Sequence, residues 1–197
     1  MTVDHRKLPR RRGEALYDAI LQATRDELAE VGYAKLTMER VAERAKASKA
    51  SLYRRWPSRM ELAIEAIYQV LREPPSPPDT GSLRGDVLAM LRRDAQLIAG
   101  PVGEALRGLL SDALRDRART AQLRRHSQGT GRAAMREITR RAVERGEIDP
   151  GAVTTVRLEV AQAMLRQQFL FNGVPIPDEV IAEIVDEVVV PLFKSPR

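Results

Sequence analysis

The chain has 197 residues and a mass of 22.1 kDa, enough to bury one large core, or a small domain beside a larger one. It contains no cysteine, which excludes a disulfide framework and a thiolate nucleophile, and its two histidines lie too far apart to anchor a metal, so we expect neither a metal nor another cofactor. The net charge of +6 resides in residues 1–60, where 14 Lys and Arg face 8 Asp and Glu. Such a localised positive field predicts a polyanionic partner, either nucleic acid or an anionic membrane surface, and a merely solvated surface is an equally open alternative at this point.

The first twelve residues, 1–12, form a basic arm. Its segment RKLPRRR holds five basic residues in seven. Two interpretations remain open: an arm that enters a minor groove of DNA, and a solvated tail without a partner. Because no apolar run approaches the roughly 20 residues of a membrane span, we expect a cytoplasmic protein with no membrane partner.

The rest of the chain is expected to be all-α. Apolar residues recur at intervals of three and four, and no segment shows the alternation of a strand. The first helix is expected from about Glu14 to Val31, with Gly32 just after its end. Two short helices follow, MERVAERA capped by Thr37 and KASLYRRW capped by Ser48, and a fourth begins after Pro57.

The two short helices and the three-residue turn between them have the layout of a helix-turn-helix. The exposed side of the second short helix would read base edges in the major groove, because its small side chains let the backbone approach. Hydroxyl and guanidinium groups near the helix starts would hold phosphates. The expected reading face is Lys49, Ala50, Ser51 and Arg54, and the expected phosphate contacts are Thr37, Ser48, Tyr53, Ser58 and Arg59.

The stretch LTMERVAERAKASKASLYRRWPSRMEL, residues 36–62, resembles without a gap the DNA-binding signature of the TetR/AcrR family of bacterial regulators. The matching positions are Thr37, Ala42, Ala45, Ser48, Leu52, Tyr53, Trp56 and Ser58. Lys46 departs from the family's glycine, which costs about 1 kcal/mol if this residue is left-handed, unless the turn is relaxed or a phosphate contact offsets the strain. Arg59 replaces the usual phosphate-binding lysine, and Trp56 replaces a phenylalanine.

The stretch EPPSPPDTG, residues 73–81, carries four prolines in nine residues and cannot continue a helix. We place a boundary here, between a helix-turn-helix DNA-binding domain over residues 13–72 and a larger helical domain over residues 82–197. Further helices are expected at 82–99, 102–116, 117–145, 152–172 and 177–193, with a break or kink at HSQGTG in the third of them.

Helix-turn-helix proteins usually read two half-sites as a two-fold dimer, so an interface is expected outside the reader. Segment 152–172 carries apolar residues on two nearly opposite faces, and burying one face leaves the other for a partner. We therefore expect a homodimer through residues 152–193, with a monomeric core as the alternative. The resemblance implies that the last two helices of each copy form a four-helix bundle.

The resemblance also implies a repressor that binds a palindromic operator and is released when a small molecule enters a pocket in the second domain. Adaptable apolar side chains favour an apolar effector, although such residues are more often simply core. The candidate lining residues are Met90, Leu97, Leu106, Leu109, Leu110, Met135, Ile138, Met164 and Phe169.

Three alternatives were weighed against this interpretation. An adaptor using its basic segment on acidic partners would have no use for phosphate-binding positions at several helix starts. An enzyme has little support, because no phosphate-binding glycine loop and no Ser/His/Asp arrangement is present. The arginine-rich segment 116–145 could be a second nucleic-acid surface, but we expect its arginines to be solvated and paired with nearby carboxylates.

Overall fold

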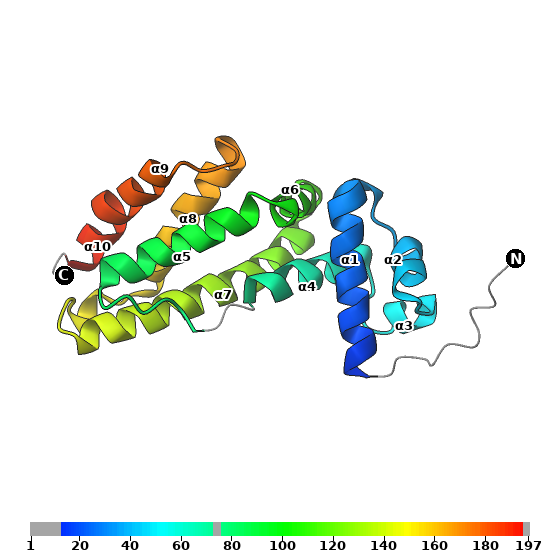
Figure 1. Cartoon of the computed structure of the whole chain (residues 1–197), viewed down its shortest axis with the longest axis horizontal. Helices are drawn as coiled ribbons and strands as arrows, with labels where there is room; N and C mark the ends of the chain where they lie inside the picture. Colours follow the sequence, from blue (N-terminus) through cyan, green and yellow to red (C-terminus); the bar gives the residue numbers. More distant parts are fainter. Residues whose placement is uncertain (1–12, 73–75, 195–197) are drawn as a thin grey trace, which may run out of the picture.

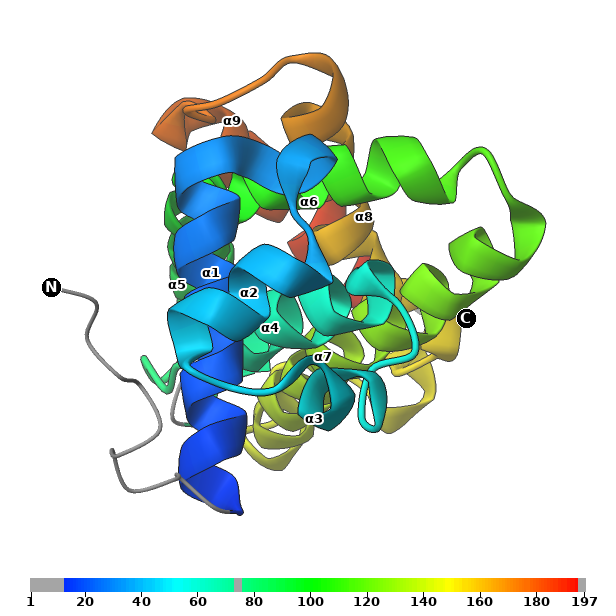
Figure 2. The ribbon, with the colours of Figure 1, turned by 90° about the vertical axis from the view of Figure 1, so that its right-hand side faces the viewer.

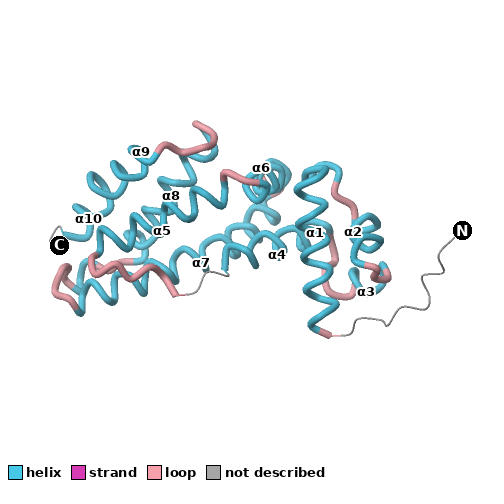
Figure 3. Tube along the Cα trace, in the orientation of Figure 1, coloured by secondary structure: helices cyan, strands magenta, loops and turns pink. Residues whose placement is uncertain are grey.

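The computed structural model describes residues 13–72 and 76–194, apart from the side chains of residues 71, 72, 122 and 124–130. The predicted basic arm, residues 1–12, therefore lies outside the described residues. Within the described ranges every regular element is a helix, as Figure 3 shows, which confirms the all-α expectation.

Four helices make up the N-terminal part, which we call the head. Gly32 has a φ of 73° and interrupts the helical backbone near the end of the first helix, where the sequence predicted a stop. The third helix ends at Tyr53 rather than at the predicted Trp56. The bounds are α1 (Glu14–Lys35), α2 (Met38–Ala45), α3 (Lys49–Tyr53) and α4 (Arg59–Arg72).

The remaining helices form a longer body that ends far from the head. Figure 1 shows α2 and α3 at one end of the molecule and the C-terminus at the other. The bounds are α5 (Leu83–Ile98), α6 (Pro101–Ala113), α7 (Arg117–Glu144), η2 (Pro150–Ala152), α8 (Thr155–Phe171), α9 (Asp178–Glu183), the π-helical η3 (Ile184–Val189) and α10 (Val190–Lys194).

The predicted break at HSQGTG is wrong, because α7 runs through both glycines of that stretch without interruption, and the alternative of a kink stays a prediction. A Cβ atom added at Gly131 would lie 2.8 Å from Cγ of Gln162, which belongs to α8. Gly131 thus lets two helices approach closely, and the packing of α7 offsets the cost of about 1 kcal/mol that a glycine imposes on a helix.

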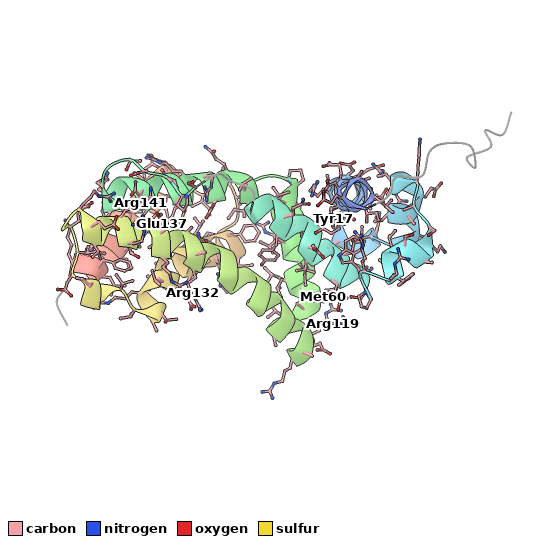
Figure 4. All side chains as sticks on the ribbon, turned by 90° about the horizontal axis from the view of Figure 1, so that it is seen from below. Tyr17, Met60, Arg119, Arg132, Glu137 and Arg141 are labelled. Carbon is pink, nitrogen blue, oxygen red and sulfur yellow. The ribbon has the colours of Figure 1, made fainter. Side chains whose placement is uncertain are left out.

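The arginines of α7 are largely paired where their side chains are described. Arg132 binds Glu159 of α8, and Arg145 binds the fully buried Asp86 of α5. Arg141 donates to the carbonyl oxygens of Pro77 and Pro78 at 3.2 and 2.8 Å, and so holds the segment that leads into α5. Figure 4 places Arg141 at the end of the molecule opposite Tyr17 of the head. Nη1 of Arg141 also lies 3.2 Å from Oδ2 of Asp79, so the expected pairing with carboxylates is confirmed for these three arginines. Their side chains are only 13 to 29% exposed, so the expectation that they are solvated is wrong for them.

The head and the body share a boundary made of packed side chains. The hydrophobic cluster of α1 to α4 also contains Ala105, Leu109 and Ala113 of α6, while Leu110 packs against both this cluster and that of the body. A Cβ atom at Gly108 would lie 2.7 Å from Cβ of Tyr33, so α6 and α1 are in close contact. The predicted boundary at residues 73–81 therefore separates the chain in sequence, but the head is not packed independently of α6.

A buried carboxylate joins α2 to α1. Glu27 of α1 is 3% exposed, and its two oxygens accept from Nε of Arg40 at 2.6 Å and Nε of Arg44 at 2.7 Å. Burial by itself would raise the pKa of Glu27, but the hydrogen bonds from the two arginines hold it below its usual value of 4.5. The ionised form is therefore the one that stabilises the fold.

We predict that Glu27→Gln lowers the free energy of unfolding at pH 7 by about 1–3 kcal/mol, because it removes a charge-assisted acceptor from a buried site. A group whose pKa is depressed by folding contributes above its unfolded pKa, and the contribution disappears as the pH falls through the folded pKa. Urea unfolding at several pH values should therefore show the two proteins converging below about pH 4.5. The exposed position Glu43→Gln serves as the control, and a constant difference between pH 7 and pH 3 would contradict the prediction.

Candidate nucleic-acid interface

Helices α2 and α3 form the outer end of the head, which faces the viewer in Figure 2. Helix α2 begins at the predicted cap, where Oγ1 of Thr37 accepts from the backbone N–H of Arg40 at 3.2 Å. Its apolar residues Met38, Val41, Ala42 and Ala45 are buried against the head. The cap uses an oxygen lone pair, so the hydroxyl proton of Thr37 remains available to an incoming acceptor.

The turn between the two helices passes through Lys46, which has φ 53° and ψ 42°. This is the left-handed conformation, so the turn is not relaxed and the predicted strain is present. The conformation lets the backbone N–H of Lys46 reach the carbonyl of Glu43 at 3.1 Å, which closes the end of α2. The Lys46 side chain is exposed.

Helix α3 has one buried side and one open side. The hydroxyl of Ser48 caps it by accepting from the N–H of Ser51 at 3.2 Å, and Leu52 is completely buried. On the open side Lys49, Ala50, Tyr53 and Arg54 are exposed, and Ser51 is half-buried. The structure therefore brings the predicted reading residues together on one surface that the described part of the chain leaves uncovered.

A hydrogen-bonded aromatic pair holds the chain just after α3. Trp56 stacks on Tyr17 of α1 with ring centroids 5.7 Å apart, and the two rings donate to the same carboxylate. Nε1 of Trp56 lies 2.6 Å from Oε2 of Glu65, and the Tyr17 hydroxyl lies 2.5 Å from Oε1. Burial, together with this bond to Glu65, raises the pKa of Tyr17 to about 12.

The role of Glu65 is not apparent from the sequence pattern, which indicates only that Trp56 replaces the phenylalanine of the family. A buried indole N–H needs an acceptor, so the search for one on the next helix could have found Glu65.

Arg59 is placed differently from the simple expectation of a free phosphate ligand. Its Nη1 donates to the carbonyl oxygens of Ala34 and Leu36 at 3.3 and 3.2 Å, and its guanidinium lies 5.0 Å from the centre of the Tyr33 ring. Arg59 thus holds the backbone at the end of α1 and just after it. Its contact with phosphate stays a prediction. Ser58 accepts from the N–H of Glu61 at 3.3 Å and so caps α4.

The predicted effector residues fall into more than one environment. Four of them belong to the core of the body and are at most 1% exposed: Met90, Met135, Ile138 and Phe169. Leu106, Leu110 and Met164 pack against that core and are only partly buried. Leu109 belongs to the cluster of the head, and Leu97 is partly buried outside both clusters. The nine residues therefore do not line one common site in this structure.

The segment predicted for dimerisation has an open apolar face. On α8 the inner residues Leu158, Ala161, Leu165 and Phe169 are buried. On the opposite side Val156 is 74% exposed, Leu170 is 41% exposed, and Phe171 at the end of the helix is 79% exposed. The two-sided pattern seen in the sequence is thus confirmed in the positions of these side chains.

Two features are absent from the described residues, 13–72 and 76–194. No helix there combines the length and apolar character needed to cross a membrane. No group of three or more His, Asp or Glu side chains there is arranged to hold a metal ion.

Comparisons with known proteins agree with this geometry. Residues 20–66 match the family described as bacterial regulatory proteins, tetR family, and residues 77–188 match the tetracyclin repressor-like C-terminal domain. The chain is 33% identical to an HTH-type transcriptional regulator of Mycobacterium tuberculosis, covering 87% of this chain and 85% of the relative. It is also 33% identical to a DNA-binding transcriptional repressor of Mycobacteroides abscessus, covering 93% and 96%.

The crystal structure of the TetR family transcription regulator SCO0332 superposes on the chain with a TM-score of 0.77 and 29% identity. The superposition covers 89% of this chain and 97% of that one. These relatives are transcriptional regulators rather than enzymes.

We predict that Lys46→Gly raises the free energy of unfolding by about 1 kcal/mol, because glycine adopts the left-handed conformation without the Cβ penalty. Lys46→Ala, which keeps the penalty and removes the charge, should leave the free energy of unfolding within about 0.5 kcal/mol of wild type. Both are measured by urea unfolding. Equal stability of the glycine and alanine variants would show that the turn carries no strain.

Proposed function

The chain belongs to the TetR family of DNA-binding transcriptional regulators, and from this premise we propose that it is a repressor that binds a palindromic operator as a homodimer and is released by a small molecule. The observation that carries the proposal is the open face of α3, where Lys49, Ala50 and Arg54 lie together at the end of the molecule. A surface of this kind fits a major groove about 12 Å wide.

The small residues of α3 support direct reading of bases. Ala50 and Ser51 present little bulk, so the helix backbone can lie near base edges, while Lys49 and Arg54 can donate to guanine. The buried Leu52 on the opposite side fixes which face is presented. We assign sequence selectivity to this face.

Phosphate contacts would come from the groups around α3. The hydroxyls of Thr37 and Ser48 cap their helices through their oxygens, and the Thr37 hydroxyl keeps a proton to donate. The hydroxyl of Ser48 also lies 2.8 Å from that of Ser51, and this pair has a second proton to offer to a phosphate. Tyr53 is 47% exposed and can offer its hydroxyl. Lys46 adds a cation at the turn, and Ser58 and Arg59 add contacts at the start of α4. These contacts would position the protein without selecting a sequence.

Dimerisation would use the open side of α8 together with α9, η3 and α10, within residues 152–193. Val156 and Phe171 leave apolar surface in water that a second copy would cover. We assign DNA binding to residues 13–72 and dimerisation and effector binding to residues 82–197.

An effector would act through α6. Leu106 and Leu110 of α6 pack against the core of the body, and Leu109 of the same helix packs in the head. A molecule that displaces α6 would therefore also shift the head. Release of DNA requires that the effector binds one arrangement of the two heads better than the other. The partly buried candidates Leu106, Leu110 and Met164 have apolar side chains, which favours an apolar effector.

We predict two distinguishable effects on DNA binding for three variants in a mobility-shift titration at two salt concentrations, using DNA that flanks the gene. Tyr53→Phe and Arg59→Ala weaken binding to all sequences, because they remove phosphate contacts. Lys49→Ala also relaxes base preference at one position by about 1–3 kcal/mol. Wild type should show selective binding with a steep dependence on salt.

Because Arg59 also bonds to the carbonyls of Ala34 and Leu36, its variant needs a thermal unfolding control. Arg59→Lys keeps the charge and separates the two roles. Unchanged affinity in all three variants would remove the assigned DNA contacts, and equal wild-type binding to every sequence would favour an adaptor with a basic surface.

We predict that Phe171→Glu gives a monomer of about 22 kDa in light scattering, whereas wild type gives twice the chain mass of 22.1 kDa. The substitution places a charge within the open apolar face, where a partner would have to bury it unpaired. Leu114→Glu is the matched control, since Leu114 is 70% exposed but lies at the end of α6, outside this face. A wild-type monomer, or a dimer that survives Phe171→Glu, would contradict the assigned interface.

A further inference from the structure

One exposed carboxylate of α2 forms an ion pair with α3, the helix proposed to read the bases. Glu39 lies in the first turn of α2, and its Oε1 is 3.0 Å from Nζ of Lys49 at the start of α3. The two side chains are 52% and 59% exposed, so the pair faces solvent and fills no gap in the core. The hydrogen bond from Lys49 lowers the pKa of Glu39, which keeps the carboxylate charged at neutral pH.

This ion pair differs from the others in the head. Arg40 and Arg44 are paired with the buried Glu27, which holds α2 against α1. Lys46 and Arg54 have no carboxylate within 4 Å among the described residues, as suits cations that are free to meet DNA. The pair of Glu39 and Lys49 anchors no buried group, and it places a negative charge where a polyanion is to dock.

A carboxylate at this place weakens binding to DNA in general. If Lys49 leaves Glu39 to bind a phosphate, Glu39 is left uncompensated beside the same backbone, and like charges repel. A base pair that accepts the two groups together removes this cost. The major groove offers such a pair, because guanine O6 accepts and the neighbouring cytosine N4 donates. These two atoms hydrogen-bond to each other and so lie about 2.9 Å apart, close to the 3.0 Å between Nζ and Oε1.

We propose that Glu39 and Lys49 read one G·C base pair together in each half-site. Nζ of Lys49 donates to guanine O6 and N7, and the Glu39 carboxylate accepts from the amino group of cytosine N4. The inference rests on the proposed function, since it requires α3 in a major groove. Glu39 is thereby a residue that determines specificity, which the sequence did not indicate.

The proposal fixes the order in which the four base pairs are accepted. C·G and A·T reverse the central acceptor and donor, so the carboxylate would face an acceptor and the ammonium a donor. T·A keeps the central order but puts a methyl group in place of guanine N7, and Lys49 loses one acceptor. G·C is therefore preferred, T·A is second, and C·G and A·T are rejected.

The test is selection from a duplex library with a randomised core, using the full chain and sequencing the bound pool. Wild type should enrich sites with one fixed G·C pair in each half-site. Glu39→Gln keeps the other selected positions but admits C·G and A·T at this one, with discrimination reduced about tenfold, because an amide both donates and accepts. Lys49→Ala should weaken the preference at the same base pair. Glu43→Gln, an exposed acid one turn further along α2, is the matched control and should select the wild-type site.

The outcomes separate the inference from the function on which it rests. Failure of wild type to enrich any sequence would overturn the proposed function and the inference with it. A selective wild type whose site is unchanged by Glu39→Gln overturns the inference alone. The inference is also overturned if Glu39→Gln and Lys49→Ala lose base preference at different base pairs. An equal loss of preference in Glu43→Gln overturns it as well.

Discussion

A helix of five residues is not stable by itself in water, so the reading surface depends on how α3 is anchored. Leu52 buries its whole side chain beneath the helix, and Trp56 just beyond it is 2% exposed and stacked on Tyr17. The carboxylate of Glu65 accepts from both rings and connects the end of α3 with α1 and α4. These anchors leave the opposite face free, and every assignment of a DNA contact depends on that choice of face.

The same head is continuous with α6, which limits how independently it can move. Leu109 of α6 is completely buried in the cluster of the head, and the Tyr33 hydroxyl donates to Asp112 of α6 at 3.2 Å. Packed interfaces of this kind move as units rather than deform gradually. An effector that shifts α6 would therefore change the position of the head relative to the body, which is the displacement that the proposed release of DNA requires.

Much of this arrangement could be predicted from residue patterns, because caps and apolar spacing act locally. Thr37 and Ser48 begin their helices as expected, and Lys46 adopts the left-handed turn. Contacts between segments that lie far apart in the sequence could not be predicted from such local patterns. Gly131 of α7 lies against the side chain of Gln162 of α8, and the positions of Arg59 and Glu65 depend on partners 9 to 48 residues away. Local periodicity carries no information about such partners.

The central claim is that the open face of α3 lies in the major groove, and the absence of cysteine from the chain allows a direct measurement. A photoactivated cross-linker attached through Ala50→Cys would be irradiated on the selected duplex. Glu144→Cys is the matched attachment site, because Glu144 is exposed at the end of α7 and lies outside the assigned dimer segment 152–193. We expect cross-links from position 50 to bases at one place in each half-site and none from position 144. Cross-links from position 144 alone, or none to bases from position 50 in a bound complex, would contradict the placement of α3 in the groove.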